Sequence, residues 1–193
     1  MENLDTFDCI VIDNTAFASG FDLNIISIQN PDVKIFLTSQ IYEEALNNTR
    51  SAQMLDIAAA QGLLRIRNPS PEALKKVVKA ATKTGDIGAI SKPDQSILAL
   101  YIDVKAEHPE WKIILMSDDY SVQNTGAELN ITILPYSKEG IKERIEWEIY
   151  CSFCYRTYPP DQLGKECENC GGTLKRRAKR NRDGRKKKSK RRK

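Results

Sequence analysis

The 193-residue sequence has one histidine, five cysteines and no long apolar run. No stretch approaches the roughly 18 consecutive apolar residues that a membrane helix needs, which excludes a membrane protein. The first five residues are acidic and lack the basic-then-apolar order of a secretory signal, so we expect a cytoplasmic protein. The single histidine, His108, stands in the segment Glu-His-Pro-Glu. We expect it to be a solvated loop residue, which leaves no histidine as a general base.

The modest net charge of +4 hides two regions of opposite sign. Residues 174–193 hold 14 of the 30 basic residues and one of the 26 acids, a net of +13, so the other 173 residues carry a net of −9. A basic block this dense does not pack into a core and usually binds polyanions. We therefore expect residues 174–193 to be a disordered tail that binds RNA phosphates, beginning with Lys175, Arg176 and Arg177.

Four of the five cysteines form two CxxC pairs near the C-terminus. Cys9 stands alone in an apolar run, where we expect a buried small hydrophobe. The two pairs are separated by twelve residues, and two such turns can present four thiolates to one tetrahedral ion. A disulfide or a redox pair fits a cytosolic chain less well, since a redox CxxC belongs in a βαβ unit. We predict a structural Cys₄ zinc ribbon over residues 150–173, with the ligands Cys151, Cys154, Cys167 and Cys170.

Aromatic and basic side chains surround the predicted zinc site. Tyr155 and Arg156 are candidates for stacking on RNA bases and for contact with phosphate, together with Phe153 and Tyr158. The alternative is that Phe153 and the tyrosines only cover the metal. The sequence leaves both interpretations open.

Residues 1–140 alternate between strand and helix patterns. The strand patterns are short, nearly continuous apolar runs, which are typical of a parallel sheet covered on both faces. Helices are expected after Asn48, Ser70 and Ser91, which are suitable N-caps. We predict an α/β domain over 1–140 and a linker or terminal helix over 141–149. The expected strands lie at 7–12, 33–37, 63–66, 111–116 and 130–134.

Acidic residues follow the strands of this domain. Asp13 comes directly after the first strand, and Asp118 and Asp119 come after the strand at 111–116. Glu43 and Glu44 lie in the helix after the second strand, while Asp94 opens a later helix. Ligands of open α/β sheets bind outside the carboxyl ends of the strands, so these acids should gather there. Clustered carboxylates suit Mg²⁺ or Mn²⁺, and such metals activate water for phosphodiester cleavage.

Each acid also has a purely structural interpretation. Asp94 fits a Ser-x-x-Asp capping box, and Asp13 fits an Asx turn or an N-cap. Ser117 would then cap a helix over 120–129, with Asp118 and Asp119 as first-turn charges. Glu43 and Glu44 would be an ordinary solvated face. The coincidence of several strand-end acids in one short domain favours the metal site.

The ordered motifs resemble those of PIN-domain nucleases, which use three or four acids around Mg²⁺ or Mn²⁺ to cut single-stranded RNA. The matching segments are Val-Ile-Asp-Asn-Thr-Ala-Phe at 11–17, Tyr-Glu-Glu at 42–44, Pro-Asp-Gln-Ser at 93–96 and Ser-Asp-Asp-Tyr at 117–120. The resemblance implies that Asp13 is the first acid, Asp94 the third and Asp119 the fourth. It implies Glu44 as the second acid with Glu43 left open, and Asp118 as an assisting residue.

A narrower resemblance joins this domain to its zinc ribbon. Thr-Gly-Asp at 84–86, Ile-Ser-Lys-Pro-Asp at 90–94 and Tyr-Ser-Val-Gln-Asn at 120–124 are similar to segments of the Nin-one-binding endonucleases. That family matures the 3′ end of small-subunit ribosomal RNA, which implies pre-rRNA in a small-subunit precursor as substrate and partner. A toxin-type PIN ribonuclease acting on mRNA or tRNA is a second hypothesis, although such toxins are usually bare PIN domains. A non-catalytic RNA-binding assembly factor is a third.

Overall fold

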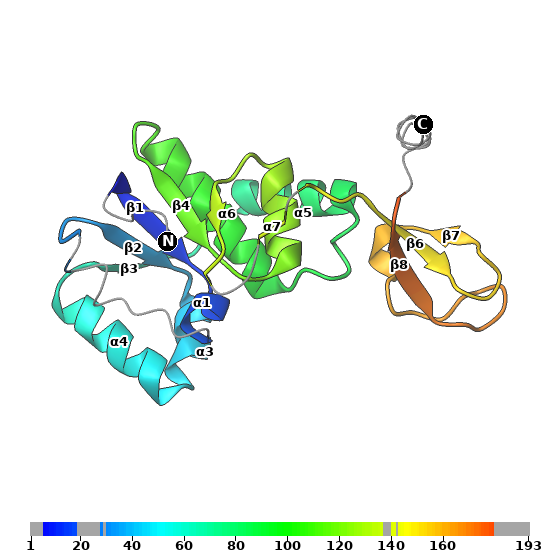
Figure 1. The fold of residues 1–193 in the computed structure, drawn as a ribbon, viewed down its shortest axis with the longest axis horizontal. Helices are drawn as coiled ribbons and strands as arrows, with labels where there is room; N and C mark the ends of the chain where they lie inside the picture. Colours follow the sequence, from blue (N-terminus) through cyan, green and yellow to red (C-terminus); the bar gives the residue numbers. More distant parts are fainter. Residues whose placement is uncertain (1–5, 19–27, 29, 137–139, 142, 180–193) are drawn as a thin grey trace, which may run out of the picture.

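The computed structural model describes residues 6–18, 28, 30–136, 140–141 and 143–179, which fold into a larger α/β unit and a small β unit (Figure 1). The α/β unit contains a five-stranded sheet of order β3-β2-β1-β4-β5 in which every neighbouring pair is parallel. This confirms the predicted fold class. Its strands are β1 (Cys9–Ile12), β2 (Lys34–Leu37), β3 (Leu64–Ile66), β4 (Ile113–Met116) and β5 (Ile133–Leu134). Its helices are α1 (Asn14–Ala18), α3 (Ser39–Leu46), α4 (Thr49–Ala60), α5 (Pro71–Thr84), α6 (Lys92–Glu107) and α7 (Tyr120–Glu128).

The two central strands carry the core of the α/β unit. Every residue of β1 and β4 is buried, because both faces of the sheet are covered. The apolar runs that predicted these strands are therefore the runs that the sheet buries. Cys9 is fully buried in β1, as expected for a small hydrophobe, and burial raises the pKa of its thiol to about 12.

The helices start where the sequence places caps. Asn48 caps α4 through its side chain, and Ser70 caps α5 with a proline in the first turn. Ser91 and Asp94 form a complete capping box at the start of α6. Gly85 ends α5 in the left-handed conformation at φ 81°, where glycine carries no Cβ penalty. The sequence offered Ser117 as the N-cap of α7. In the structure Asp119 is the N-cap, and its side chain accepts the backbone N–H groups of the first turn of α7.

The small unit is an antiparallel sheet of order β7-β6-β8, with β6 at Trp147–Cys151, β7 at Thr157–Tyr158 and β8 at Leu174–Ala178. A single 3₁₀ turn, η2 (Pro160–Gln162), lies between β7 and the second cysteine pair. In Figure 1 this sheet lies to one side of the α/β unit, beyond α5 and α7.

The observed limits of the small unit differ from the expected ones. β6 begins at Trp147, inside the predicted linker, and the described part of 141–149 contains no helix. β8 occupies the first five residues of the predicted disordered tail, because all five pair with β6. The remainder of the expected tail, 180–193, lies outside the described residues. In the described part of the chain no helix is long and apolar enough to cross a bilayer.

Candidate functional site

Asp13 stands at the centre of the candidate site, directly after β1. It is 1% exposed, and its Oδ2 accepts hydrogen bonds from the hydroxyls of Thr15 and Ser117 at 2.8 and 2.7 Å. Its Oδ1 accepts the backbone N–H of Asn14 at 2.7 Å. Burial raises the pKa of Asp13, the nearby charge of Asp94 raises it further, and the hydrogen bonds lower it. A buried carboxylate of this kind gains stability from a cation.

Asp119 follows the end of β4 and is linked to Asp13 through its backbone N–H and Ser117. Its Oδ1 accepts the backbone N–H groups of Ser121 and Val122 at 2.6 and 3.1 Å, which caps α7. Its own N–H donates to the hydroxyl of Ser117 at 3.2 Å, and that hydroxyl also donates to Asp13. β1 and β4 are neighbours at the point where the strand order of the sheet reverses, so both acids lie at its switch point.

Asp94 enters the site from the first turn of α6. Its Oδ2 accepts the backbone N–H and the hydroxyl of Ser91 at 3.1 and 2.7 Å, which confirms the capping box. Its charge also acts on Asp13. A capping role and a place beside Asp13 are therefore compatible, so the structural interpretation of Asp94 does not remove it from the site.

The structure distinguishes the two glutamates of α3. Glu44 Oε2 accepts the side-chain amide of Asn14 at 3.2 Å, and Asn14 follows Asp13 in the chain. Both glutamates are exposed, and the backbone carbonyl of Glu43 accepts the side-chain amide of Asn47 at 3.4 Å. Glu44 is thus connected to the Asp13 region.

Asp118 is buried and binds the segment after β5. Its Oδ1 accepts the backbone N–H of Tyr136 at 2.8 Å, and its own N–H donates to the Thr15 hydroxyl at 3.0 Å. Asp118 therefore fastens the segment after β5 to the end of β4. The sequence motifs include Thr15 and Ser117, but only the structure shows that both hydroxyls orient Asp13.

The acids fit a hard divalent cation, although they do not enclose one. Among the described residues the only group of three or more potential ligands close enough to hold a metal ion is the set of four cysteines. Mg²⁺ needs only one or two carboxylates, because it keeps several waters and binds substrate phosphates. The buried carboxylate of Asp13, with two hydroxyls and the charge of Asp94 beside it, meets that requirement.

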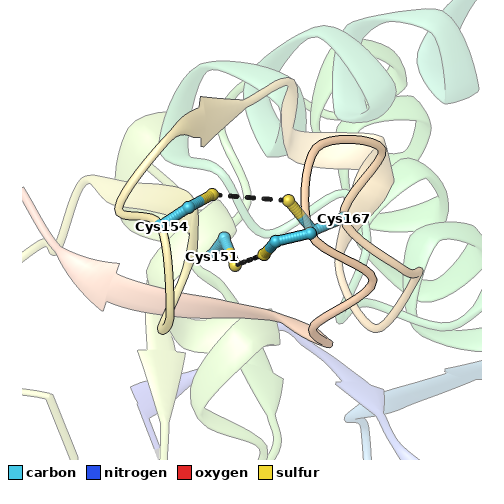
Figure 2. A group of neighbouring side chains, drawn as sticks. Cys151, Cys154 and Cys167 are labelled. Atoms are coloured by element: carbon cyan, nitrogen blue, oxygen red, sulfur yellow. Dashed lines mark hydrogen bonds between the residues drawn. The ribbon is translucent and has the colours of Figure 1, made fainter.

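The four cysteines converge as the spacing predicts, and Figure 2 shows three of them labelled on the small unit. Their sulfur atoms all lie within 4.8 Å of one another, with Cys151 and Cys170 at 3.4 Å and Cys154 and Cys167 at 3.5 Å. Gly171, at φ 71°, forms the turn after the second pair. Four thiols at this separation can hold one tetrahedral metal ion.

Hydrogen bonds prepare some of these thiols for a metal. Backbone N–H groups, above all that of Cys154, lower the pKa of Cys151. The Tyr158 hydroxyl, with its oxygen 2.9 Å from the sulfur of Cys167, is the main cause that lowers the pKa of that thiol to about 6. Although the N–H of Gly172 lowers it, the pKa of Cys170 is raised to about 12 by its bond to Cys151. A thiol must lose its proton to bind metal, so metal binding here releases protons.

The aromatic residues around the cysteines divide into two groups. Tyr158 packs against the small core formed by Ile149, Cys151, Cys167 and Leu174. Phe153 and Tyr155 are 75% and 69% exposed, and Arg156 is exposed beside them. Tyr158 therefore covers the metal site, whereas Phe153 and Tyr155 are available to a ligand.

The basic residues of β8 are less available than the sequence indicates. Arg176 Nη1 lies 3.2 Å from Oδ1 of Asp86, and its guanidinium lies 4.5 Å from the centre of the Trp147 ring. Arg177 binds Oε2 of Glu148 through two nitrogens and lies over the ring of Tyr150. Lys175 is exposed.

Comparison with known proteins supports a nuclease. A model of the PIN domain of ribonuclease matches residues 10–104, which include Asp13, Glu44 and Asp94. Endoribonuclease Nob1 of Methanothermobacter thermautotrophicus is 30% identical over 89% of this chain and 94% of its own length. Other archaeal proteins of the same name also match.

Two further relatives have different names. Ribonuclease VapC1 of Thermoplasma acidophilum is 30% identical over 86% of this chain and 76% of its own length. The 20S-pre-rRNA D-site endonuclease NOB1 of Saccharomyces cerevisiae is 26% identical over 53% of this chain and 23% of its own. All of these relatives are named as nucleases that act on RNA or pre-rRNA, so a non-catalytic assembly factor is the least supported of the three hypotheses.

Proposed function

The chain belongs to the Nob1 family of endoribonucleases, and from this premise we propose that it cleaves single-stranded pre-ribosomal RNA at the 3′ end of small-subunit rRNA. The name of the yeast relative, a 20S-pre-rRNA D-site endonuclease, supports this substrate. The proposal includes a small-subunit precursor particle as partner. It also includes a cytoplasmic location, where thiols stay reduced.

The observation that carries the chemistry is the buried Asp13, held by two hydroxyls at the switch point of the sheet. We propose that Asp13, Asp94 and Asp119 bind Mg²⁺ or Mn²⁺, with Glu44 as the next acid. Such an ion lowers the pKa of a bound water and stabilises the leaving oxygen of the phosphodiester. Thr15 and Ser117 keep the Asp13 carboxylate in one orientation. Asn14 holds Glu44 toward the site.

The small unit supplies binding rather than cleavage in this proposal. The four cysteines hold structural Zn²⁺, since all four positions of a tetrahedral ion are taken by protein. Phe153, Tyr155 and Arg156 present stacking and charged groups to RNA on the exposed side. The basic segment after β8 adds affinity that depends on salt and not on sequence.

A toxin-type ribonuclease acting on mRNA or tRNA is the second candidate, because a VapC1 ribonuclease is also 30% identical to this chain. The two candidates share the acidic site and differ in substrate. Competition between substrates distinguishes them. An RNA that carries the small-subunit 3′ junction should be cut in preference to a tRNA or an unstructured mRNA of equal length.

The first test is Asp13→Asn in the full chain, with cleavage of the small-subunit junction RNA measured in Mn²⁺ and in Mg²⁺. Loss of even an outer-shell partner of a metal costs roughly 10- to 100-fold, so loss of this ligand should cost at least about 100-fold. The variant should remain folded, because an amide keeps the shape of the side chain and no longer has to be buried as a charge.

The matched control uses the neighbouring glutamates of α3. Glu44→Gln should reduce cleavage by about 10-fold, since it weakens one acid of the site. Glu43→Gln should leave the rate unchanged, because the hydrogen bond to Asn14 is made by Glu44 and not by Glu43. Equal losses in both variants would remove Glu44 from the site. Full activity of Asp13→Asn would overturn the metal assignment.

A further inference from the structure

A cavity of about 600 Å³ lies between the start of α7 and the small β unit. Its lining is largely apolar, and much of it comes from Tyr120, Ile141, Ile145 and Trp147. Ligand pockets in proteins commonly have volumes of a few hundred to about 1,000 Å³, so the cavity can accept a group as large as a nucleoside.

Three polar residues that line the cavity, Asp86, Asn124 and Arg176, bind other protein groups. Asp86 is fully buried, and its two oxygens bind Arg176 at 3.2 Å and the Asn124 amide at 2.6 Å. The same Asn124 side chain exchanges hydrogen bonds with the backbone of Ile145, at 2.7 and 2.6 Å. The guanidinium of Arg176 is further held by the Trp147 ring. Arg176, the basic residue among the described residues that line the cavity, is therefore already paired and does not favour a phosphate there.

The wall formed by Trp147 is fixed against the α/β unit. A Cβ on Gly85 would lie 2.5 Å from the Trp147 carbonyl oxygen, so this contact is as close as backbone allows. Gly85 also has φ 81° and precedes Asp86. The small unit and the end of α5 thus meet in tight contact at Gly85, which fixes the Trp147 backbone against the α/β unit.

Another residue that lines the cavity, Tyr120, comes directly after a candidate metal ligand in the chain. Tyr120 follows Asp119 directly, is 52% exposed and is the first residue of α7. If an RNA phosphate lies at Asp119, the aromatic ring of the next residue in the chain is therefore beside it. The exposed Glu143 at the cavity repels phosphate but not a neutral base. Planar bases stack on aromatic side chains without regard to sequence.

We propose that this cavity binds one unpaired base of the RNA substrate, stacked against Tyr120 and Trp147, while the adjoining phosphate stays outside the cavity at the acidic site. This inference rests on the proposed ribonuclease function. It gives the small unit a part in placing the scissile phosphate, because Trp147 belongs to β6.

The test combines a substitution in the full-length protein with an abasic site in the RNA, and RNA binding is measured for each combination. Tyr120→Ala removes the ring, and Tyr120→Phe is the matched control that keeps it. Single abasic sites are placed at each position of a short single-stranded RNA around the junction. In the wild type, one abasic position should weaken binding by roughly 5- to 100-fold, the range for loss of one stacked base. In Tyr120→Ala the same abasic site should have a clearly smaller effect, because only Trp147 is left to stack on the base, and Tyr120→Phe should behave as the wild type.

A second measurement does not depend on catalysis. The chain has two tryptophans, and Trp111 stacks on His108 beyond the opposite end of β4. In a Trp111→Phe background the fluorescence of Trp147 should be quenched by the RNA in EDTA, and less by the RNA with the critical abasic site. Independent, additive effects of the two changes, or no quenching at saturating RNA, would overturn the proposal. Quenching without cleavage of the intact RNA in Mn²⁺ would instead contradict the proposed function and leave the cavity assignment standing.

Discussion

The two folded units of this chain reach stability by different means. The α/β unit buries a continuous core that includes every residue of its central strands β1 and β4. The core of the small unit consists of Ile149, Cys151, Cys167 and Leu174, so two of its four residues belong to the cysteine cluster. Units this small usually need a metal or disulfides to fold. On the proposed function, a metal ion is therefore a catalytic ligand of the α/β unit and a structural component of the small unit.

The largest predicted difference between the two units follows from the loss of one thiol of the cysteine cluster. In Cys170→Ser the small unit should lose its metal and unfold, because metal binding is its main source of folding free energy. The α/β unit should stay folded, since its core shares no residue with the small unit. The measurements are metal content per chain and the thermal unfolding of the full-length protein followed by circular dichroism.

Cys9→Ala is the matched control for that variant. Cys9 is buried in β1, and burial raises the pKa of its thiol to about 12, so it stays protonated and binds no metal. The metal content of this variant should equal that of the wild type, while the α/β unit should unfold at a lower temperature. One metal ion per chain in Cys170→Ser would contradict the Cys₄ site.

A smaller effect should follow from shortening the basic segment. Ending the chain after Lys179 removes ten basic residues and one acid, a net of +9, and keeps β8. RNA binding at low salt should weaken, and the dependence of affinity on salt should flatten by about 0.7 for each lost phosphate contact. Cleavage at saturating RNA should change little, because the removed residues include no acid of the site.

The control for this truncation is one that ends after Thr173. It also removes β8, whose five residues pair with β6 and whose Leu174 belongs to the small core. Metal content should fall only in the shorter chain. Salt titrations of binding and single-turnover cleavage then separate the charge of the segment from the stability of the ribbon. An unchanged salt slope in the longer chain would show that 180–193 does not contact RNA.

Local patterns predicted most of the α/β unit but not its junction with the ribbon. Continuous apolar runs identified β1 and β4, and Ser-Pro signals identified the starts of α5 and α6. β8 was missed because Lys-Arg-Arg has no strand pattern. It is a strand because β6 lies beside it and because Asp86, Glu148 and two aromatic rings hold its arginines.

The position of the candidate acids at strand and helix ends could be predicted from the sequence, but their contacts could not. The order of the strands brings Asp13 and Asp119 together, and strand-end position alone indicates that much. The choice between Glu43 and Glu44 depends on one amide of Asn14, and Asp118 is engaged by the backbone N–H of Tyr136. Such contacts join residues far apart in the chain, so no local pattern encodes them.

The smallest predicted effect compares two basic residues of β8. Both residues are exposed, but Arg177 is paired with Glu148 and lies over the ring of Tyr150. A phosphate would have to displace Glu148 from Arg177, but it can reach Lys175 directly. Lys175→Met should therefore lower the salt slope of RNA binding by about 0.7, while Arg177→Met should leave that slope unchanged. Because exposed ion pairs contribute little, Arg177→Met should change the stability of the ribbon by less than about 1 kcal/mol. Salt titrations of both variants are the measurement, and a larger loss of slope in Arg177→Met would show that RNA opens the pair with Glu148.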